Sequence, residues 1–192
     1  MDELNILNHA IEYIEMLFSS DCGGHDAAHS KRVYHNALLI ADTEPDCDRF
    51  IVALAALLHD ADDHKLFHTE NNENARTFLA KHRIDNTQAE QICEIINGIS
   101  FSKNRGIRPN MLEGKIVQDA DRLDAIGAIG IARTFAFGGE RKRPLEDSVQ
   151  HFHDKLLLLK SEMNTKEGLR LAESRHSMMV QFLEELEREM TI

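Results

Sequence analysis

Apolar residues recur at intervals of three and four along most of the chain, which places them on one face of an α-helix. The N-terminal stripe consists of Leu4, Leu7, Ile11, Ile14 and Phe18. A longer C-terminal stripe consists of Leu169, Ala172, His176, Met179, Leu183, Leu186 and Met190. Period-two alternation, the pattern of a half-buried strand, is missing. The sequence therefore predicts an all-α fold. The C-terminal stripe is expected to pack on the core, with a homodimer seam as the alternative.

Turn residues and capping signals divide this pattern into predicted helices. The helices cover about residues 4–18, 26–42, 48–59, 74–82, 87–99, 112–137, 149–159 and 169–190. The run from Thr87 to Glu90 has the form of a capping box, which opens a helix. Gly138 and Gly139 are typical of a helix end. Because the chain has no repeat and no linker, residues 1–192 are predicted to form a single domain.

The most apolar stretch of the chain, residues 50–58, leads directly into His59 and Asp60. A helix that is apolar on nearly all sides is buried, and a carboxylate beside an imidazole is costly to bury without a partner. A metal ion is a suitable partner, because it neutralises the carboxylate and accepts the imidazole nitrogen. The alternative is a structural His–Asp hydrogen bond at the end of the helix.

The composition narrows the class of protein. The chain has 192 residues, of which 42% are apolar and 29% are charged, and its formal net charge is -11. This acidity argues against an extended nucleic-acid groove, which needs a basic face. A small phosphorylated ligand is compatible with it, because a metal ion can supply positive charge locally. Apolar runs are too short to span a membrane and the first residues lack a basic signal region, so a cytoplasmic protein is expected.

Imidazole and acidic side chains lie in three segments on three different predicted helices. The three pairs are His25 and His29, His59 and Asp60, and Asp121 and Asp124. Residues three or four apart share one helical face, so the first and third pairs can each present their polar groups together. The helix around Asp121 is apolar, and its carboxylates therefore need a counter-charge. A metal ion, Arg122 or Arg133 could provide it.

The order of these segments, His then His-Asp then Asp, resembles the HD-domain superfamily of metal-dependent phosphohydrolases. Residues 119–133, Asp-Ala-Asp-Arg-Leu-Asp-Ala-Ile-Gly-Ala-Ile-Gly-Ile-Ala-Arg, and residues 24–33 resemble its small, single-domain bacterial branch. The resemblance implies a single HD-domain helical bundle whose metal ligands are His29, His59, Asp60 and Asp121. Two imidazoles and two carboxylates suit Mn²⁺, Mg²⁺, Co²⁺ or Fe²⁺ better than they suit a thiolate-rich zinc site.

The chemistry expected of such a site needs a proton-transfer group and cations beside the metal. Asp63 occupies the place where related enzymes carry an acid/base residue, and His64 is its rival. An exposed loop carboxylate is the alternative reading of Asp63. The candidate phosphate contacts are Arg32, Lys65, Lys103 and Arg133. Arg32 is the best placed of the four because it lies about one helical turn from His29.

The resemblance implies cleavage of a phosphate ester or anhydride of a small molecule, most readily a nucleotide. Two other hypotheses stay open at this point, a non-catalytic metal-dependent nucleotide sensor and a di-iron oxygenase. A di-iron site needs two further histidines. His64, His68 and His82 lie between His59 and Asp121 and could supply them. The Gly-Tyr-Pro signature of the cyclic-di-nucleotide phosphodiesterase branch is absent.

Overall fold

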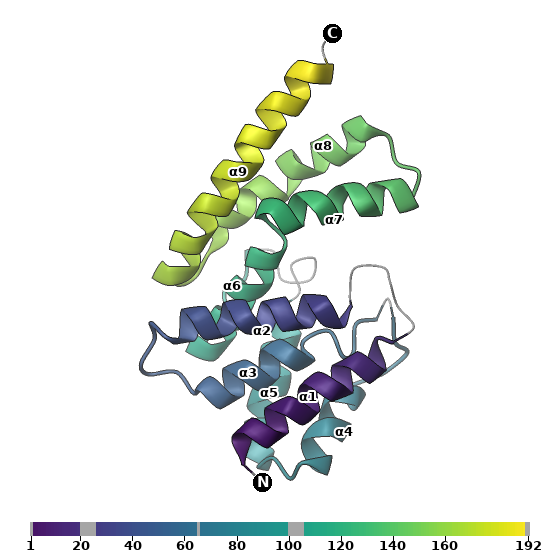
Figure 1. Ribbon diagram of the computed structural model, residues 1–192. Coiled ribbons are helices and arrows are strands. Elements are labelled where there is room, and N and C mark those ends of the chain that lie inside the picture. Colours follow the sequence, from purple (N-terminus) through teal and green to yellow (C-terminus); the bar gives the residue numbers. More distant parts are fainter. Residues whose placement is uncertain (1, 20–25, 65, 100–105, 191–192) are drawn as a thin grey trace. The chain divides into compact units, whose positions relative to one another are not determined.

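The computed structural model describes residues 2–19, 26–64, 66–99 and 106–190 (Figure 1). Throughout these ranges the regular structure is helical and no strand occurs, so the all-α prediction is confirmed. The chain forms two compact units, Met1–Asp121 and Arg122–Ile192. That these units fold as a single domain stays a prediction. None of the described helices is long and apolar enough to cross a lipid bilayer.

The first unit is built around its most apolar helix, α3. Its helices are α1 (Glu3–Leu17), α2 (Ala27–Ala41), α3 (Arg49–Leu58), α4 (Glu73–Lys81), α5 (Asn86–Ile99) and α6 (Leu112–Asp124), which ends in the second unit. Helix α3 packs against α1, α2 and α5, and every residue from Ile51 to Leu58 is buried. The Asp48 carboxylate caps its N-terminus by accepting from two backbone N–H groups. The end of α3 is thereby held in the interior.

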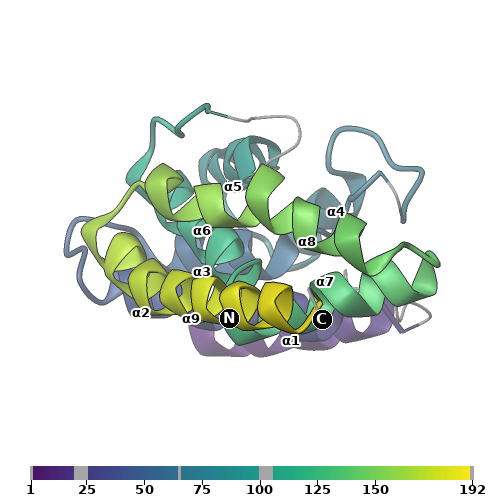
Figure 2. The ribbon, with the colours of Figure 1, turned by 90° about the horizontal axis from the view of Figure 1, so that it is seen from above.

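The second unit consists of α7 (Gly127–Glu140), α8 (Leu145–Asp154), the 3₁₀ helix η1 (Leu156–Glu162) and α9 (Lys166–Met190) (Figure 2). Both α8 and α9 pack against α7 and η1. The rings of Phe135, Phe152 and Phe182 gather between α7, α8 and α9. Ala172, Met179 and Leu183 are buried, so the middle of the predicted C-terminal stripe packs on this unit's core, whereas its two ends are exposed.

The single long helix predicted over residues 112–137 is wrong. The chain leaves α6 at Asp124 and re-enters a helix at Gly127. Gly127 has a φ of +76°, and a Cβ atom there would lie 2.9 Å from the Cβ of Arg175. Only glycine satisfies both the left-handed backbone and this close approach. The helix end predicted at Gly138 and Gly139 is confirmed to within one residue, because α7 ends at Glu140.

The predicted capping box at Thr87–Glu90 is wrong as well. Helix α5 begins one residue before Thr87, and the Asp85 carboxylate accepts a hydrogen bond from the Thr87 N–H at 2.8 Å. Glu90 instead pairs with Arg76 of α4 through two hydrogen bonds of 2.6 and 2.8 Å. A side-chain partner from another helix therefore replaced the local one that the sequence pattern indicates.

The predicted face of α1 is rotated. The buried residues of this helix are Ile6, Ala10 and Ile14, whereas Leu4 is 63% exposed. The buried face therefore follows a four-residue spacing that includes the small residue Ala10, which permits close packing against α2 and α3.

Candidate metal centre

Helix α2 presents His29 in its first turn. The Asp26 carboxylate accepts a hydrogen bond from the His29 N–H at 2.7 Å and caps the helix. Val33 and Ala37, one and two turns further along the same face, are completely buried. These contacts fix both the start and the rotation of α2, and they hold the His29 side chain at 5% exposure.

The residues that follow α3 supply the next two side chains. Helix α3 ends at Leu58 and is followed directly by His59 and Asp60. The Nδ1 atom of His59 lies 2.9 Å from the carbonyl oxygen of Ala56, one turn back. Because a carbonyl only accepts, Nδ1 carries the proton and the lone pair of a neutral ring is on Nε2. This is the arrangement that supporting hydrogen bonds produce in metal-binding histidines.

Helix α6 supplies Asp121. Val117 and Ala120 on this helix are completely buried. The side-chain amide of Asn36 on α2 donates to the Ala120 carbonyl at 3.4 Å, next to Asp121. This bond ties α6 to the helix that carries His29. The neighbouring Asp119 is completely buried.

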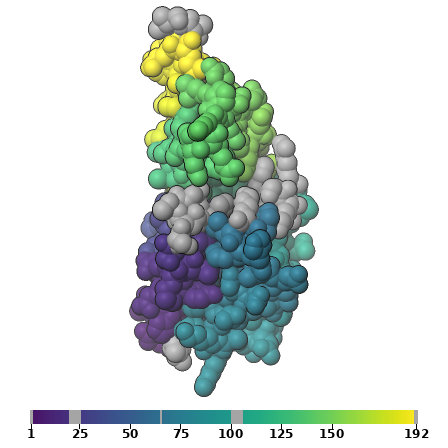
Figure 3. All heavy atoms as spheres, turned by 90° about the vertical axis from the view of Figure 1, so that its right-hand side faces the viewer, coloured from purple at the N-terminus to yellow at the C-terminus, as the bar shows by residue number. Residues whose placement is uncertain are grey.

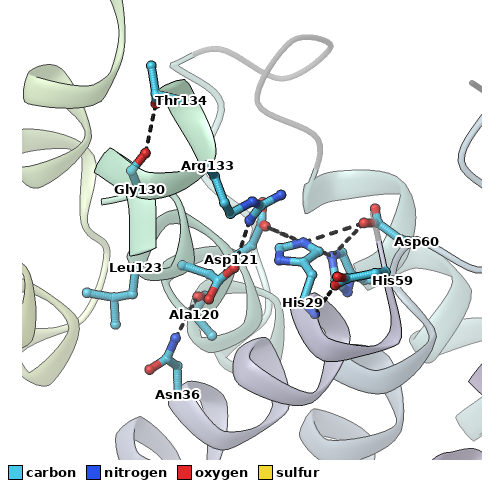
Figure 4. Close-up of polar contacts among 12 residues, drawn as sticks. His29, Asn36, His59, Asp60, Ala120, Asp121, Leu123, Gly130, Arg133 and Thr134 are labelled. Atoms are coloured by element: carbon cyan, nitrogen blue, oxygen red, sulfur yellow. Dashed lines mark hydrogen bonds and ion pairs between the residues drawn. The ribbon is translucent and has the colours of Figure 1, made fainter. Parts of the chain in front are cut away.

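The four side chains point toward one another (Figure 4). The Nε2 atoms of His29 and His59 are 3.2 Å apart. An Asp60 Oδ2 atom lies 3.5 Å from the first of these nitrogens and 3.4 Å from the second. The Oδ1 atom of Asp121 lies at 3.5 and 3.9 Å from the same two nitrogens. The donors of His29, His59 and Asp121 all lie within 4.8 Å of one another.

These separations fit one divalent ion. Ligand atoms about 2.1 Å from an ion are about 3.0 Å apart at a right angle and about 3.4 Å apart at a tetrahedral angle. The distances from the two imidazole nitrogens lie between 3.2 and 3.9 Å, from within this range to about 0.5 Å above it. In the neutral ring, the lone pair on His59 Nε2 faces the other imidazole and two carboxylates, which is where a cation would bind.

The electrostatics of the cluster favour positive charge. Burial works against a charged His59, but the facing carboxylates of Asp60 and Asp121 outweigh it and raise the pKa of His59 to about 9. Burial likewise opposes the charged form of Asp121, yet its hydrogen bond to His29 and the charge of His59 leave its pKa lowered. The Asp121 side chain is 26% exposed, against 4% for His59.

A family model, the HD domain, matches residues 26–126, a range that contains all four side chains. The chain belongs to the HD domain family. The YpgQ protein of Bacillus subtilis is 39% identical to it over 198 residues, covering 98% of this chain and 96% of that protein. The resemblance to the superfamily seen in the sequence motifs is thereby confirmed.

Solved structures of other HD domain proteins share the fold over nearly the whole chain. A crystal structure of B. subtilis YpgQ in complex with ADP superposes with a TM-score of 0.86 at 37% identity, covering 98% of this chain and 97% of that one. An HD-superfamily hydrolase from Bacillus thuringiensis gives a TM-score of 0.81 at 35% identity, with 99% of each chain covered. Both similarities extend well beyond the residues that the family model matches.

The two candidate acid/base residues differ in their exposure to solvent. The Asp63 side chain is 13% exposed, whereas His64 is 63% exposed. The chain turns here, with the Asp63 N–H donating to the Asp60 carbonyl at 3.1 Å. Asp63 is therefore a shielded carboxylate next to the cluster in sequence, and its alternative reading as an exposed loop residue does not hold. Its role in proton transfer stays a prediction.

The candidate cations have different surroundings. Arg32 lies on α2 about one turn after His29 and is partly exposed. Arg133 on α7 donates to the buried Asp124 carboxylate at 2.7 Å. Arg133 thus provides a counter-charge for Asp124. It is one of the three sources of counter-charge that the sequence offered for this helix. Lys65 and Lys103 lie outside the described residues. The substrate contacts of all four stay predictions.

The additional histidines do not join the cluster. His64 and His68 are exposed, and His82 stacks on the rings of His9 and Phe78 at 5.1 and 4.4 Å between centroids. In the part of the chain that the structure describes, the group able to hold an ion contains none of the three. Their geometry gives no support to a second ion.

Sequence reasoning missed the residues that support this cluster. The Ala56 carbonyl sets the His59 ring, and the Asn36 amide joins α2 to α6. The first is a backbone group three residues before the histidine, and its position can be anticipated once the helix is known. The second links positions 84 residues apart. Asn36 stands beside apolar positions of a buried face, and that polar residue in an apolar stripe is the signal that could have identified it.

Proposed function

We propose that this chain is a divalent-metal-dependent hydrolase that cleaves a phosphate ester or anhydride bond of a nucleotide. The observation that carries the proposal is the convergence of two imidazole nitrogens and two carboxylates, with His59 held so that its Nε2 lone pair faces the others. A purely structural His–Asp hydrogen bond would not require a second histidine and a second aspartate from two further helices at the same point.

In this proposal His29, His59, Asp60 and Asp121 hold the ion. A divalent ion bound there would polarise a phosphoryl oxygen and lower the pKa of a coordinated water. Two nitrogen and two carboxylate ligands suit Mn²⁺, Mg²⁺, Co²⁺ or Fe²⁺. With the ion bound, His59 would keep its Nδ1 proton on the Ala56 carbonyl and coordinate as a neutral imidazole.

The remaining groups serve the substrate. Asp63 is shielded and close in sequence to Asp60, and we assign it the role of accepting the proton of the attacking water. Arg32 supplies positive charge for the phosphate oxygens from the helix that carries His29. Hydrolysis would then form a bond between the water oxygen and phosphorus and break the bond from phosphorus to the leaving oxygen, which takes up the proton from Asp63.

The nucleotide is supported by a relative. The YpgQ protein, which shares 37% identity with this chain in the structural comparison, was crystallised in complex with ADP. The net charge of -11 also favours a substrate whose phosphates are bound through a metal ion, because the chain as a whole repels anions.

The test is an assay of metal-stripped protein against nucleoside mono-, di- and triphosphates, each with Mn²⁺, Mg²⁺, Co²⁺ or Fe²⁺ added separately. Products are followed by ³¹P NMR, which distinguishes release of phosphate from release of pyrophosphate. We expect turnover only after a metal is restored. Nucleotide binding without turnover under every condition would contradict the hydrolase and favour a sensor. An optical signature of a redox-active iron pair would favour an oxygenase.

A further inference from the structure

The turn that follows α3 carries both Asp60 and Asp63, and it is not part of a helix. Its backbone is folded by two short-range hydrogen bonds, from the Ala61 N–H to Leu58 and from the Asp63 N–H to Asp60, at 3.0 and 3.1 Å. Such a turn has few bonds of its own to fix the direction of its side chains. Its geometry must therefore depend on contacts with the rest of the first unit.

Helix α4 supplies these contacts through a reciprocal pair of side chains. The Asp62 carboxylate accepts from the backbone N–H groups of Asn74 and Ala75, at 2.9 and 3.0 Å. The Asn74 side-chain amide donates in the opposite direction, to the Ala61 carbonyl at 2.8 Å. Asp62 thus caps α4 across 12 residues of sequence, while Asn74 holds the peptide group between Ala61 and Asp62.

Helix α1 braces this junction from outside. The Tyr13 hydroxyl donates to the Asn74 carbonyl at 3.0 Å, and the Tyr13 ring packs on Phe78 with 5.2 Å between centroids. Burial and the nearby Asp62 charge raise the pKa of Tyr13, as expected for a hydroxyl that stays a donor. In Figure 3 the purple spheres of α1 lie against the blue spheres of the segment after α3. Asn74 is therefore held on both sides.

We propose that Asn74 is a positioning residue for the metal centre, because its amide holds the Ala61 carbonyl and thereby the turn that carries Asp60 and Asp63. The inference rests on the proposed function. Asn74 touches neither the ion nor the substrate in this role. Ala61 is completely buried, so a carbonyl that loses the amide has to move in order to find another partner. Because Ala61 directly follows Asp60, movement of the peptide between Ala61 and Asp62 would shift Asp60 and change the direction of its side chain.

The chemistry of the position requires an amide. Asn74 must donate to a carbonyl while its own backbone N–H is bound to the Asp62 carboxylate. An aspartate at position 74 would have nearly the same shape but no side-chain donor. Its charge would also face the Ala61 carbonyl oxygen and stand close to Asp62. Asn74→Asp is therefore predicted to perturb the turn more than Asn74→Ala.

The experiment measures Mn²⁺ affinity of the metal-stripped full chain by calorimetry for wild type, Asn74→Ala and Asn74→Asp. Two controls accompany them. Asn71→Asp adds the same charge at an exposed position nearby, and Leu79→Ala destabilises α4 from its buried face without touching the turn. We expect Asn74→Ala to weaken Mn²⁺ binding about 10-fold and Asn74→Asp up to about 100-fold, the range for residues that support metal ligands. Both controls should bind as wild type does.

A second readout needs no metal. Hydrogen exchange of the metal-free protein should speed up at the Asp63 amide in Asn74→Ala, but not in Leu79→Ala, at a temperature where both are folded. Wild-type Mn²⁺ affinity in both Asn74 variants would overturn the positioning role while leaving the proposed function intact. Equal weakening in Leu79→Ala would also overturn it, because loss of α4 stability alone would then explain the effect. A wild-type protein that binds no divalent ion would refute the proposed function itself.

Discussion

Asp121 and Asp124 lie one turn apart on α6, yet their carboxylates are neutralised in different ways. Asp124 is 2% exposed and accepts a 2.7 Å hydrogen bond from the guanidinium of Arg133. Asp121 is 26% exposed and faces the imidazoles of His29 and His59. A guanidinium is always charged and completes an ion pair within the protein. Imidazoles can be neutral, and they leave the carboxylate's charge available to a cation.

This difference separates a structural acid from a candidate ligand where the sequence cannot. Both residues belong to the same run, Asp119 to Asp124, on an equally apolar helix. An acidic residue on a buried helix therefore identifies a need for counter-charge but not its source. The type of the partner decides whether the carboxylate is a structural acid or a candidate metal ligand.

The largest effect is expected at Asp121. Asp121→Asn keeps the side-chain volume but removes the charge, so metal retention should fall by more than the roughly 10–100-fold that a supporting residue costs. Hydrolysis should fall with it, while the helix content measured by circular dichroism stays unchanged. Metal content after dialysis provides the measurement, with Asp124→Asn as the matched control. Equal metal retention in wild type and Asp121→Asn would exclude Asp121 as a ligand.

The next largest effect is expected at Asp63. Asp63→Asn should lower kcat by about 10²–10⁴-fold, the range for a missing general base, and leave the metal content unchanged. His64→Gln is the control because His64 is mostly exposed, and we expect it to retain kcat. Steady-state kinetics at saturating metal checks both. A large loss of kcat at His64 alone would transfer the role to that histidine.

A third prediction concerns the ion pair between Asp124 and Arg133. Arg133→Ala leaves the Asp124 carboxylate buried without its Arg133 partner, which should lower the free energy of unfolding by about 2 kcal/mol. This is less than for a fully buried pair, because Arg133 is 32% exposed. Metal affinity should not change. Chemical denaturation measures the loss, and the exposed Arg141→Ala is its control. An unchanged unfolding free energy with a raised KM would instead support the phosphate contact predicted for Arg133.

The sequence was informative where a local pattern carried the information. The helical spacing predicted an all-α fold, which is confirmed. The motif order predicted His29, His59, Asp60 and Asp121 as metal ligands; their side chains lie close together, and their role as ligands stays a prediction. Prediction from the sequence failed where the local structure is determined by a residue that is distant along the chain. At the break before Gly127, the atoms that leave no room for a side chain belong to Arg175, 48 residues further along the chain. No local pattern shows which acid of the 62–63 pair caps α4, because the hydrogen-bond partners of Asp62 are 12 and 13 residues away.

The smallest effect is a pH dependence of Mn²⁺ affinity, which arises from His59 beside Asp121. Without metal, the pKa of His59 is raised to about 9 from an ordinary value of 6.5, so the ring is protonated at neutral pH. Metal binding must displace that proton, and the affinity for Mn²⁺ should therefore increase by up to about tenfold per pH unit until about pH 9. Calorimetry in two buffers of different ionisation enthalpy should detect the released proton.

The raised pKa of His59 affects the stability of the metal-free protein in the opposite direction: stability falls as the pH rises. Because the folded protein binds this proton more tightly than the unfolded chain, metal-free His59 contributes stability that is fully present below pH 6.5 and lost as the pH rises through about 9. The Tm of metal-free protein should thus fall between pH 6.5 and 9 while metal affinity rises. His59→Gln should abolish both slopes, whereas Arg133→Ala should retain both. If Tm and Mn²⁺ affinity changed with pH in the same direction, or if Tm did not depend on pH across this range, the proton that the metal replaces would not be the one on His59.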